Sequence, residues 1–176
     1  MNRRDAIFNF VVISAGVVLL PSCGQNEAAT IPLKNISLTA GEEKLVRKLT
    51  SLIIPKKDFI GAEDVNATEF TLMMVDDCHP PEKQAAFKEA LQHFDKLATA
   101  RYGKSFTNCT ATQQNEFLTA MESKKDIPDN VLQFYRTTKG YTVQAFTSSK
   151  EFLTGVAKYK MVPGSNFKGC VAVKKV

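Results

Sequence analysis

The stretch PPEKQAAFKEALQHFDKLATARYG, residues 80–103, constrains the fold more than any other part of the sequence. Its apolar side chains recur every three or four residues with charged and amide side chains between them, and this spacing predicts an amphipathic α-helix. Pro81 suits the first turn of such a helix, and Gly103 suits its left-handed end. The apolar stripe needs other helices to cover it, and it consists of Phe87, Ala90, Leu91, Phe94, Leu97 and Ala98.

Other helix starts are marked by capping boxes, in which a Ser or Thr and a Glu or Gln three residues later satisfy the free amides of the first turn. The boxes lie at residues 39–42, 110–113 and 148–151. Pro128 predicts one more helix start, and Gly140 offers a place where the following helix can bend. We therefore expect an all-α protein over residues 39–176, a compact helical bundle of about five to six helices with an irregular, extended C-terminal segment.

Residues 1–22 have the layout of an export signal. Arg3 and Arg4 form a cationic start, an apolar run follows to Leu20, and small residues precede Cys23. The apolar run has about fifteen residues, fewer than the roughly 20 that a membrane-spanning helix needs. An N-terminal core helix is the alternative, but it explains neither the paired arginines nor the small residues before the cysteine.

The sequence Leu20-Pro21-Ser22-Cys23 resembles the bacterial lipobox, in which the cysteine is acylated and becomes the mature N-terminus. We therefore predict lipidation of Cys23 and attachment to a membrane through its acyl chains. Arg3 and Arg4 also resemble a twin-arginine export signal, although Ala6 stands where that pattern has Phe. Residues 23–38 are small and polar, and they predict a lipid-anchored tether.

The charge pattern argues against a nucleic-acid partner. The chain carries a formal net charge of +5, but its lysines occur singly or in pairs with acidic residues nearby. No arginine-rich run and no basic stripe with interleaved aromatics is present in the sequence. The lysines therefore predict a solvated surface.

The sequence contains no motif of a catalytic site. It has two histidines, His79 and His93, and neither belongs to a Cys-x-x-Cys-His haem motif. No P-loop, dinucleotide fingerprint or nucleophile elbow occurs. The neighbouring carboxylates Asp76 and Asp77 point in different directions on a helix, so they form a poor acid–base pair. We expect no cofactor and no catalytic activity, and surface or capping roles for the histidines rather than a metal site.

Cysteine chemistry beyond Cys23 remains open. In an exported protein two of the other cysteines can pair, and we favour Cys78 with Cys170, because that bond would fix the C-terminal segment to the bundle. Cys109 precedes a predicted helix start and suits a small buried site. The alternative is three reduced thiols.

Several short motifs, taken in order, resemble the gluconate 2-dehydrogenase subunit 3 family over roughly residues 40–173. The first is an Ile-Pro step followed by a loop and a Gly-Ala pair, and the next is a long helix that ends in Tyr-Gly before a Phe and a Thr-x-x-Gln cap. The last is a Pro-Gly step before Gly-Cys-Val. These motifs are Ile54-Pro55, Gly61-Ala62, Tyr102-Gly103, Phe106, Thr110 to Gln113, Pro163-Gly164 and Gly169-Cys170-Val171.

This resemblance implies a non-catalytic accessory subunit without a cofactor of its own. Members accompany a large flavin-dependent dehydrogenase of the glucose–methanol–choline type, often with a cytochrome c, and are thought to carry the folded flavoprotein across the membrane. For this chain it implies a location on the periplasmic side of the bacterial envelope. The partner surface is then expected at exposed apolar residues in the loop after Ile54 and in the C-terminal segment, namely Phe59, Ile60, Met161, Pro163, Gly164 and Phe167.

Two other hypotheses remain. A freestanding periplasmic helical lipoprotein would bind a small ligand or another envelope protein, and it predicts a closed, polar surface. An enzyme in its own right would need a cofactor site for which the sequence has no motif.

Overall fold

The computed structural model describes residues 27–124 and 127–159. These residues form six α-helices and two short 3-10 helices, and the all-α expectation is confirmed. None of the described helices has the length and apolar character to cross a bilayer. The helices are α2 (Ala40–Ile53), α3 (Ala67–Cys78), α4 (Pro81–Tyr102), α5 (Ala111–Ser123), α6 (Asp129–Thr147) and α7 (Lys150–Gly155), with η3 (Glu63–Val65) and η4 (Phe106–Asn108) between them.

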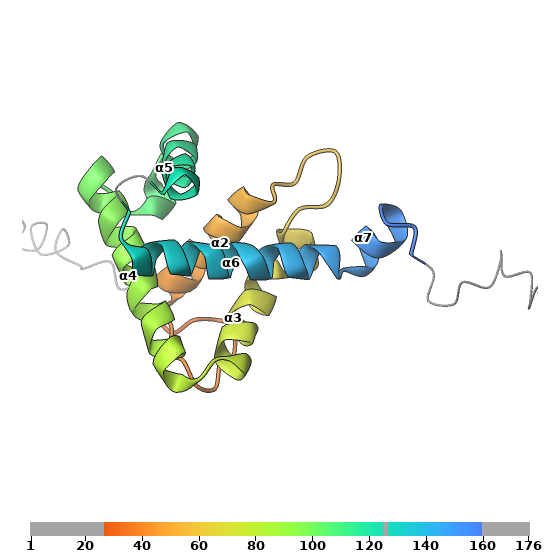
Figure 1. Ribbon diagram of the computed structural model, residues 1–176, viewed down its shortest axis with the longest axis horizontal. Helices are drawn as coiled ribbons and strands as arrows, with labels where there is room; N and C mark the ends of the chain where they lie inside the picture. Colours follow the sequence, from red (N-terminus) through yellow and green to blue (C-terminus); the bar gives the residue numbers. More distant parts are fainter. Residues whose placement is uncertain (1–26, 125–126, 160–176) are drawn as a thin grey trace, which may run out of the picture.

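Helix α6 is the central element of the bundle. It crosses the molecule and packs on α2, α3 and α4, while α7 lies beyond its C-terminal end (Figure 1). It continues without interruption through Gly140. Aromatic rings fill the core beside the first half of α6. The ring of Phe94 lies 5.0 Å from those of Phe106 and Phe117 and 5.4 Å from that of Phe134. All four rings are buried, so the predicted stripe of α4 faces the core.

The local helix signals act where the sequence predicts them. Thr39 and Glu42 form a reciprocal capping box at the start of α2, and Thr110 and Gln113 form another at the start of α5. Pro81 occupies the first turn of α4, and Gly103 ends that helix with a φ of 72°.

The third predicted box is wrong by one residue. Ser149, not Ser148, caps α7 and accepts a hydrogen bond from the amide of Phe152 at 3.2 Å. The reason is that Ser148 belongs to the preceding helix end, where its hydroxyl donates to the carbonyl of Gln144 at 2.6 Å.

The structure differs from the predicted tether over residues 27–38. This stretch, called the N-terminal strap below, lies against the helices and buries Ile31, Ile36 and Leu38. The amide of Ala29 donates to the carbonyl of Leu38 at 3.0 Å, which folds the strap back on itself. Its isolated apolar residues, spaced among polar ones, therefore belong to the core of the domain.

Two buried carboxylates hold the strap. On α3, Asp76 accepts the amides of Lys34, Asn35 and Ile36 at 2.7, 2.8 and 2.7 Å. Burial by itself raises the pKa of Asp76, but these hydrogen bonds outweigh it, and the pKa lies below its ordinary value of 3.8.

On α2, Glu43 accepts the amide and hydroxyl of Thr30 at 2.6 and 2.8 Å and the amide of Ile31 at 3.2 Å. Arg47 donates to the same carboxylate at 2.7 Å. Burial alone raises the pKa of Glu43, and the hydrogen bonds again lower it below its ordinary value of 4.5.

Candidate functional site

Aromatic rings gather at the C-terminal end of α6. The ring of Phe146 lies 6.4 Å from that of Phe59 and 5.4 Å from that of Phe152, so residues from the loop after α2, from α6 and from α7 meet there. Val143, one turn before Phe146, and Val156, just after α7, are exposed by 41% and 53%. We call Phe59, Val143, Phe146, Phe152 and Val156 the aromatic surface.

The loop that carries Phe59 has a defined shape. The amide of Ala62 donates to the carbonyl of Ile54 at 2.9 Å and closes the loop. Asp64 accepts the amide of Gly61 at 2.8 Å and the ammonium of Lys56 at 2.7 Å. A Cβ on Gly61 would lie 2.6 Å from the amide nitrogen of Lys56, so only glycine fits. The hydrogen bond from Lys56, and then that from Gly61, lower the pKa of Asp64.

The predicted interface residues have different outcomes. Phe59 is 44% exposed, and Ile60 beside it is half-buried. Met161, Pro163, Gly164 and Phe167 lie outside the described residues, as do Arg3, Arg4 and Cys23. Sequence reasoning did not single out Phe146, Phe152 or Val156 as interface residues. The sequence did contain a signal for them. The short helix capped by Ser149 ends within a few residues, so its apolar side chains have few neighbours that could bury them.

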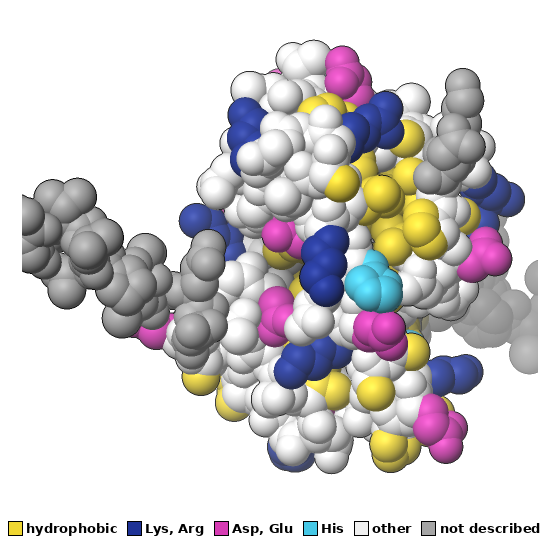
Figure 2. All heavy atoms as spheres, turned by 90° about the vertical axis from the view of Figure 1, so that its left-hand side faces the viewer, with side chains coloured by type: hydrophobic (Ala, Val, Ile, Leu, Met, Phe, Trp, Pro, Cys, Tyr) yellow, Lys and Arg dark blue, Asp and Glu magenta, His cyan; other side chains and the backbone are white. Residues whose placement is uncertain are grey.

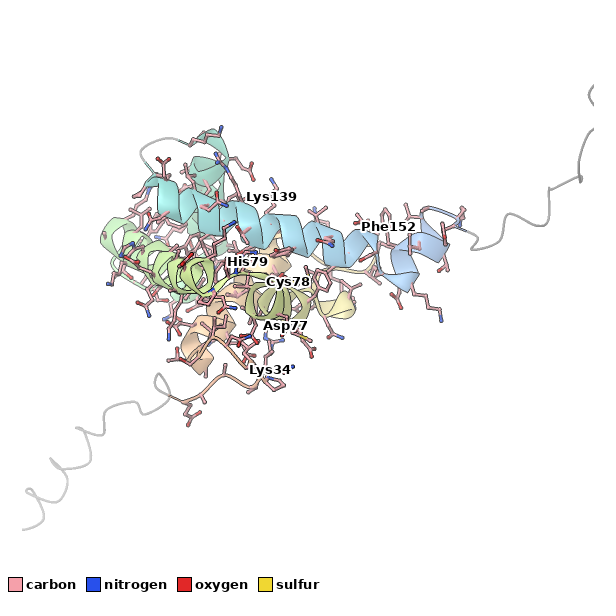
Figure 3. The ribbon with its side chains drawn as sticks, turned by 60° about the horizontal axis from the view of Figure 1, so that its bottom comes forward. Lys34, Asp77, Cys78, His79, Lys139 and Phe152 are labelled. Carbon is pink, nitrogen blue, oxygen red and sulfur yellow. The ribbon has the colours of Figure 1, made fainter. Side chains whose placement is uncertain are left out.

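A groove of about 620 Å³ lies between α4 and α6, on another side of α6. We call it the α4–α6 groove. Phe87, Ala90 and Phe134 contribute apolar lining, and Lys83 and Arg136 contribute positive charge. Figure 3 shows His79 and Cys78 at the end of α3 next to α6, and Phe152 far from them on α7.

His79 lines this groove as part of a polar pair. Its Nε2 lies 2.7 Å from the hydroxyl oxygen of Tyr141. Burial, and then the charge of Lys83, lower the pKa of His79 below 6.5, so the imidazole is neutral at pH 7. The other histidine, His93, lies on α4, and its Nδ1 is 2.8 Å from the side-chain amide nitrogen of Asn130.

A second hollow lies between α4 and α5. Leu97 and Ile127 contribute apolar lining, and Arg101 and Glu116 bring charges of opposite sign. Figure 2 views the side of the molecule that α4 forms, where apolar side chains gather in one area with charged side chains around them. This hollow therefore carries charges of both signs, whereas the charged residues lining the α4–α6 groove are Lys83 and Arg136.

The described residues contain no group of three His, Cys, Asp or Glu side chains able to hold a metal ion. Asp76 is buried and holds the strap, whereas Asp77 is exposed, so the two do not act as a pair. Cys78 is exposed and Cys109 is buried, and they are not bonded to each other. Burial raises the pKa of the Cys109 thiol. The predicted bond from Cys78 to Cys170 stays a prediction, because Cys170 lies outside the described residues.

Comparison with protein families identifies a family for most of the chain. Residues 40–164 match the family model described as gluconate 2-dehydrogenase subunit 3. No curated protein and no solved structure matches the chain. The matched range begins at the first residue of α2 and contains every described helix, together with the loop of Phe59.

Proposed function

The chain belongs to the gluconate 2-dehydrogenase subunit 3 family, and from this premise we propose that it is a non-catalytic accessory subunit of a flavin-dependent sugar or sugar-acid dehydrogenase. In this proposal the large, glucose–methanol–choline-type flavoprotein carries the active site, and a cytochrome c completes some assemblies. The chain stabilises the flavoprotein, assists its export and attaches it to a membrane.

The aromatic surface is the observation that supports this proposal most directly. Phe59 and Val156 are about half exposed, although burying such side chains is favourable by about 1.5–3 kcal/mol each. The Phe59 loop is closed by Gly61 and Asp64, so it presents its ring without having to be ordered on binding. A preformed apolar surface of this kind fits a stable subunit contact.

The export and anchoring parts of the proposal rest on the sequence. Arg3 and Arg4 would direct the chain across the inner membrane, and acylated Cys23 would hold it on the periplasmic side of the envelope. The freestanding lipoprotein remains the alternative. It expects a closed, polar surface, and the exposed aromatic surface favours the subunit.

The proposal is tested by purifying the tagged full chain from its native envelope and measuring the flavin absorption and the co-purifying proteins. We expect a flavoprotein dehydrogenase in stoichiometric amount. The double variant Phe59→Ser with Val156→Ser should retain about tenfold less flavoprotein, because it removes two apolar anchors. Met73→Ser is the matched control, since Met73 lies on α3 and is as exposed as Phe59, at 44%.

Two results would contradict the proposal. One is a colourless preparation without a partner from the unaltered chain. The other is equal retention of the flavoprotein by the double variant and by Met73→Ser, which would contradict the role of the aromatic surface alone.

A further inference from the structure

Gly140 lines the α4–α6 groove at a helix position where the backbone does not require glycine. Gly140 lies in the interior of α6, and a Cβ built on it meets no atom of the described residues within 4 Å apart from the adjacent backbone of α6 itself. Glycine destabilises a helix interior by about 1 kcal/mol relative to alanine. Alanine would therefore stabilise α6 without a clash, whereas a large side chain would occupy the groove.

The charges that line the groove have one sign. Lys83 and Arg136 are both exposed, and no carboxylate lines the groove among the residues that the structure describes. Within those residues neither cation takes part in an ion pair. Such cations attract an anion, and the fork of a guanidinium suits the paired oxygens of a carboxylate or sulfonate.

The remaining lining suits an apolar body with some polar groups. The rings of Phe87 and Phe134 lie 5.0 Å apart, and Ala86 and Ala90 line the same groove. His79 and Tyr141 add hydrogen-bonding groups whose mutual contact fixes their positions.

We propose that the α4–α6 groove binds a small organic anion with an apolar, ring-sized body. Its carboxylate or sulfonate would lie at Lys83 and Arg136. Its body would lie beside the exposed Ala86 in the space left by Gly140, above the nearly fully buried Phe87, Ala90 and Phe134. The groove volume of about 620 Å³ lies within the range of natural small-molecule sites. This site is separate from the aromatic surface, and the proposal does not depend on the subunit role.

The test is a titration of the full chain, labelled with ¹³C at its alanine methyl groups, with 2-naphthalenesulfonate. We expect saturable shifts of the Ala86 and Ala90 signals and none at Ala120, which lines the hollow between α4 and α5. The neutral analogue 2-naphthalenemethanol should bind about fivefold more weakly, because it offers no charge to the two cations.

Variants of Gly140 separate groove filling from loss of fold. Gly140→Leu should weaken 2-naphthalenesulfonate binding about tenfold, because the side chain takes the place of the ligand. Gly140→Ala should bind within about twofold of the unaltered chain and unfold at a higher temperature. The comparison of the two variants shows whether ligand binding needs the open space beside Gly140.

Variants of the cations test the charge. Lys83→Gln combined with Arg136→Gln should reduce sulfonate binding to the level of the neutral analogue. Lys96→Gln is the control, since Lys96 is an exposed α4 residue outside the groove. The proposal is overturned if Gly140→Leu binds as well as Gly140→Ala, if Ala120 shifts in place of Ala86 and Ala90, or if the charged and neutral probes bind equally.

Discussion

Asp76 and Asp77 are neighbours in the sequence with different roles in the structure. Asp76 is buried and accepts three amides of the N-terminal strap, whereas Asp77 is exposed. The difference comes from their positions around α3, because one residue is a rotation of about 100° on a helix. A pair of carboxylates in a sequence therefore does not define a site until the face of each is known.

This contrast gives a matched pair of variants. Asp76→Asn should lower the free energy of unfolding by about 2 kcal/mol, because an amide oxygen replaces a charged acceptor and its NH₂ group faces the donor amides. Asp77→Asn should change it by less than about 0.5 kcal/mol. Urea unfolding of the two variants measures the difference, and equal stability would mean that Asp76 does not hold the strap.

Two glycines give predictions of opposite sign. Gly61→Ala should destabilise the protein by about 1–3 kcal/mol, because its Cβ would meet the backbone of Lys56 at 2.6 Å. Gly140→Ala should stabilise it by about 1 kcal/mol, because its Cβ enters open space in a helix. The unfolding temperatures of the two variants measure both effects. Shifts in the same direction would show that the contacts of the added Cβ do not determine the stability change at these positions.

At the scale of elements, the helix boundaries could be predicted and the strap could not. Thr39 and Glu42 cap α2 across three residues, so their signal is local and visible in the sequence. Asp76 holds Ile36 across 40 residues of chain. The pairing of the strap with α3 depends on how the helices assemble, and the polar residues of the strap resemble those of a tether.

The strap should loosen in acid. The pKa values of Glu43 and Asp76 lie below their ordinary values of 4.5 and 3.8, so the unfolded state binds protons first as the pH falls. Their stabilisation is complete above those ordinary values and is lost as the pH drops through the lower folded values. The unfolding temperature should therefore fall steeply below about pH 4.5.

The double variant Glu43→Gln with Asp76→Asn serves as the control for this pH effect. It should be less stable than the unaltered chain at pH 7, and its unfolding temperature should change less between pH 6 and pH 3. An equally steep acid dependence in the variant would assign the effect to other carboxylates.

At the scale of the whole molecule, α6 joins two surfaces without merging them. Val143 and Phe146 contribute to the aromatic surface, and Thr137, Gly140 and Gln144 line the groove. The groove escaped sequence reasoning because Lys83 and Arg136 lie on different helices, 53 positions apart in the chain. The exposure of Phe59 could be predicted because its place in a loop is a local feature, while its role at an interface stays a prediction.

This separation predicts that the two proposed functions respond independently. Phe59→Ser with Val156→Ser should leave 2-naphthalenesulfonate binding unchanged, and Gly140→Leu should leave flavoprotein retention unchanged. Titration and co-purification of both variants measure this directly. Loss of both properties in either variant would indicate that the partner and the small anion use one continuous surface, or that α6 is disturbed as a whole.

The strap also determines how far an anchored domain can move. Between Cys23 and the strap only Gly24, Gln25 and Asn26 remain, and the four steps of chain to Glu27 reach at most about 14 Å. A tether that stayed free as far as Thr39 would reach about 55 Å. The proposed acylation of Cys23 would therefore hold the domain close to its lipid attachment, with one side turned to the bilayer, and a released strap would allow about fourfold more reach.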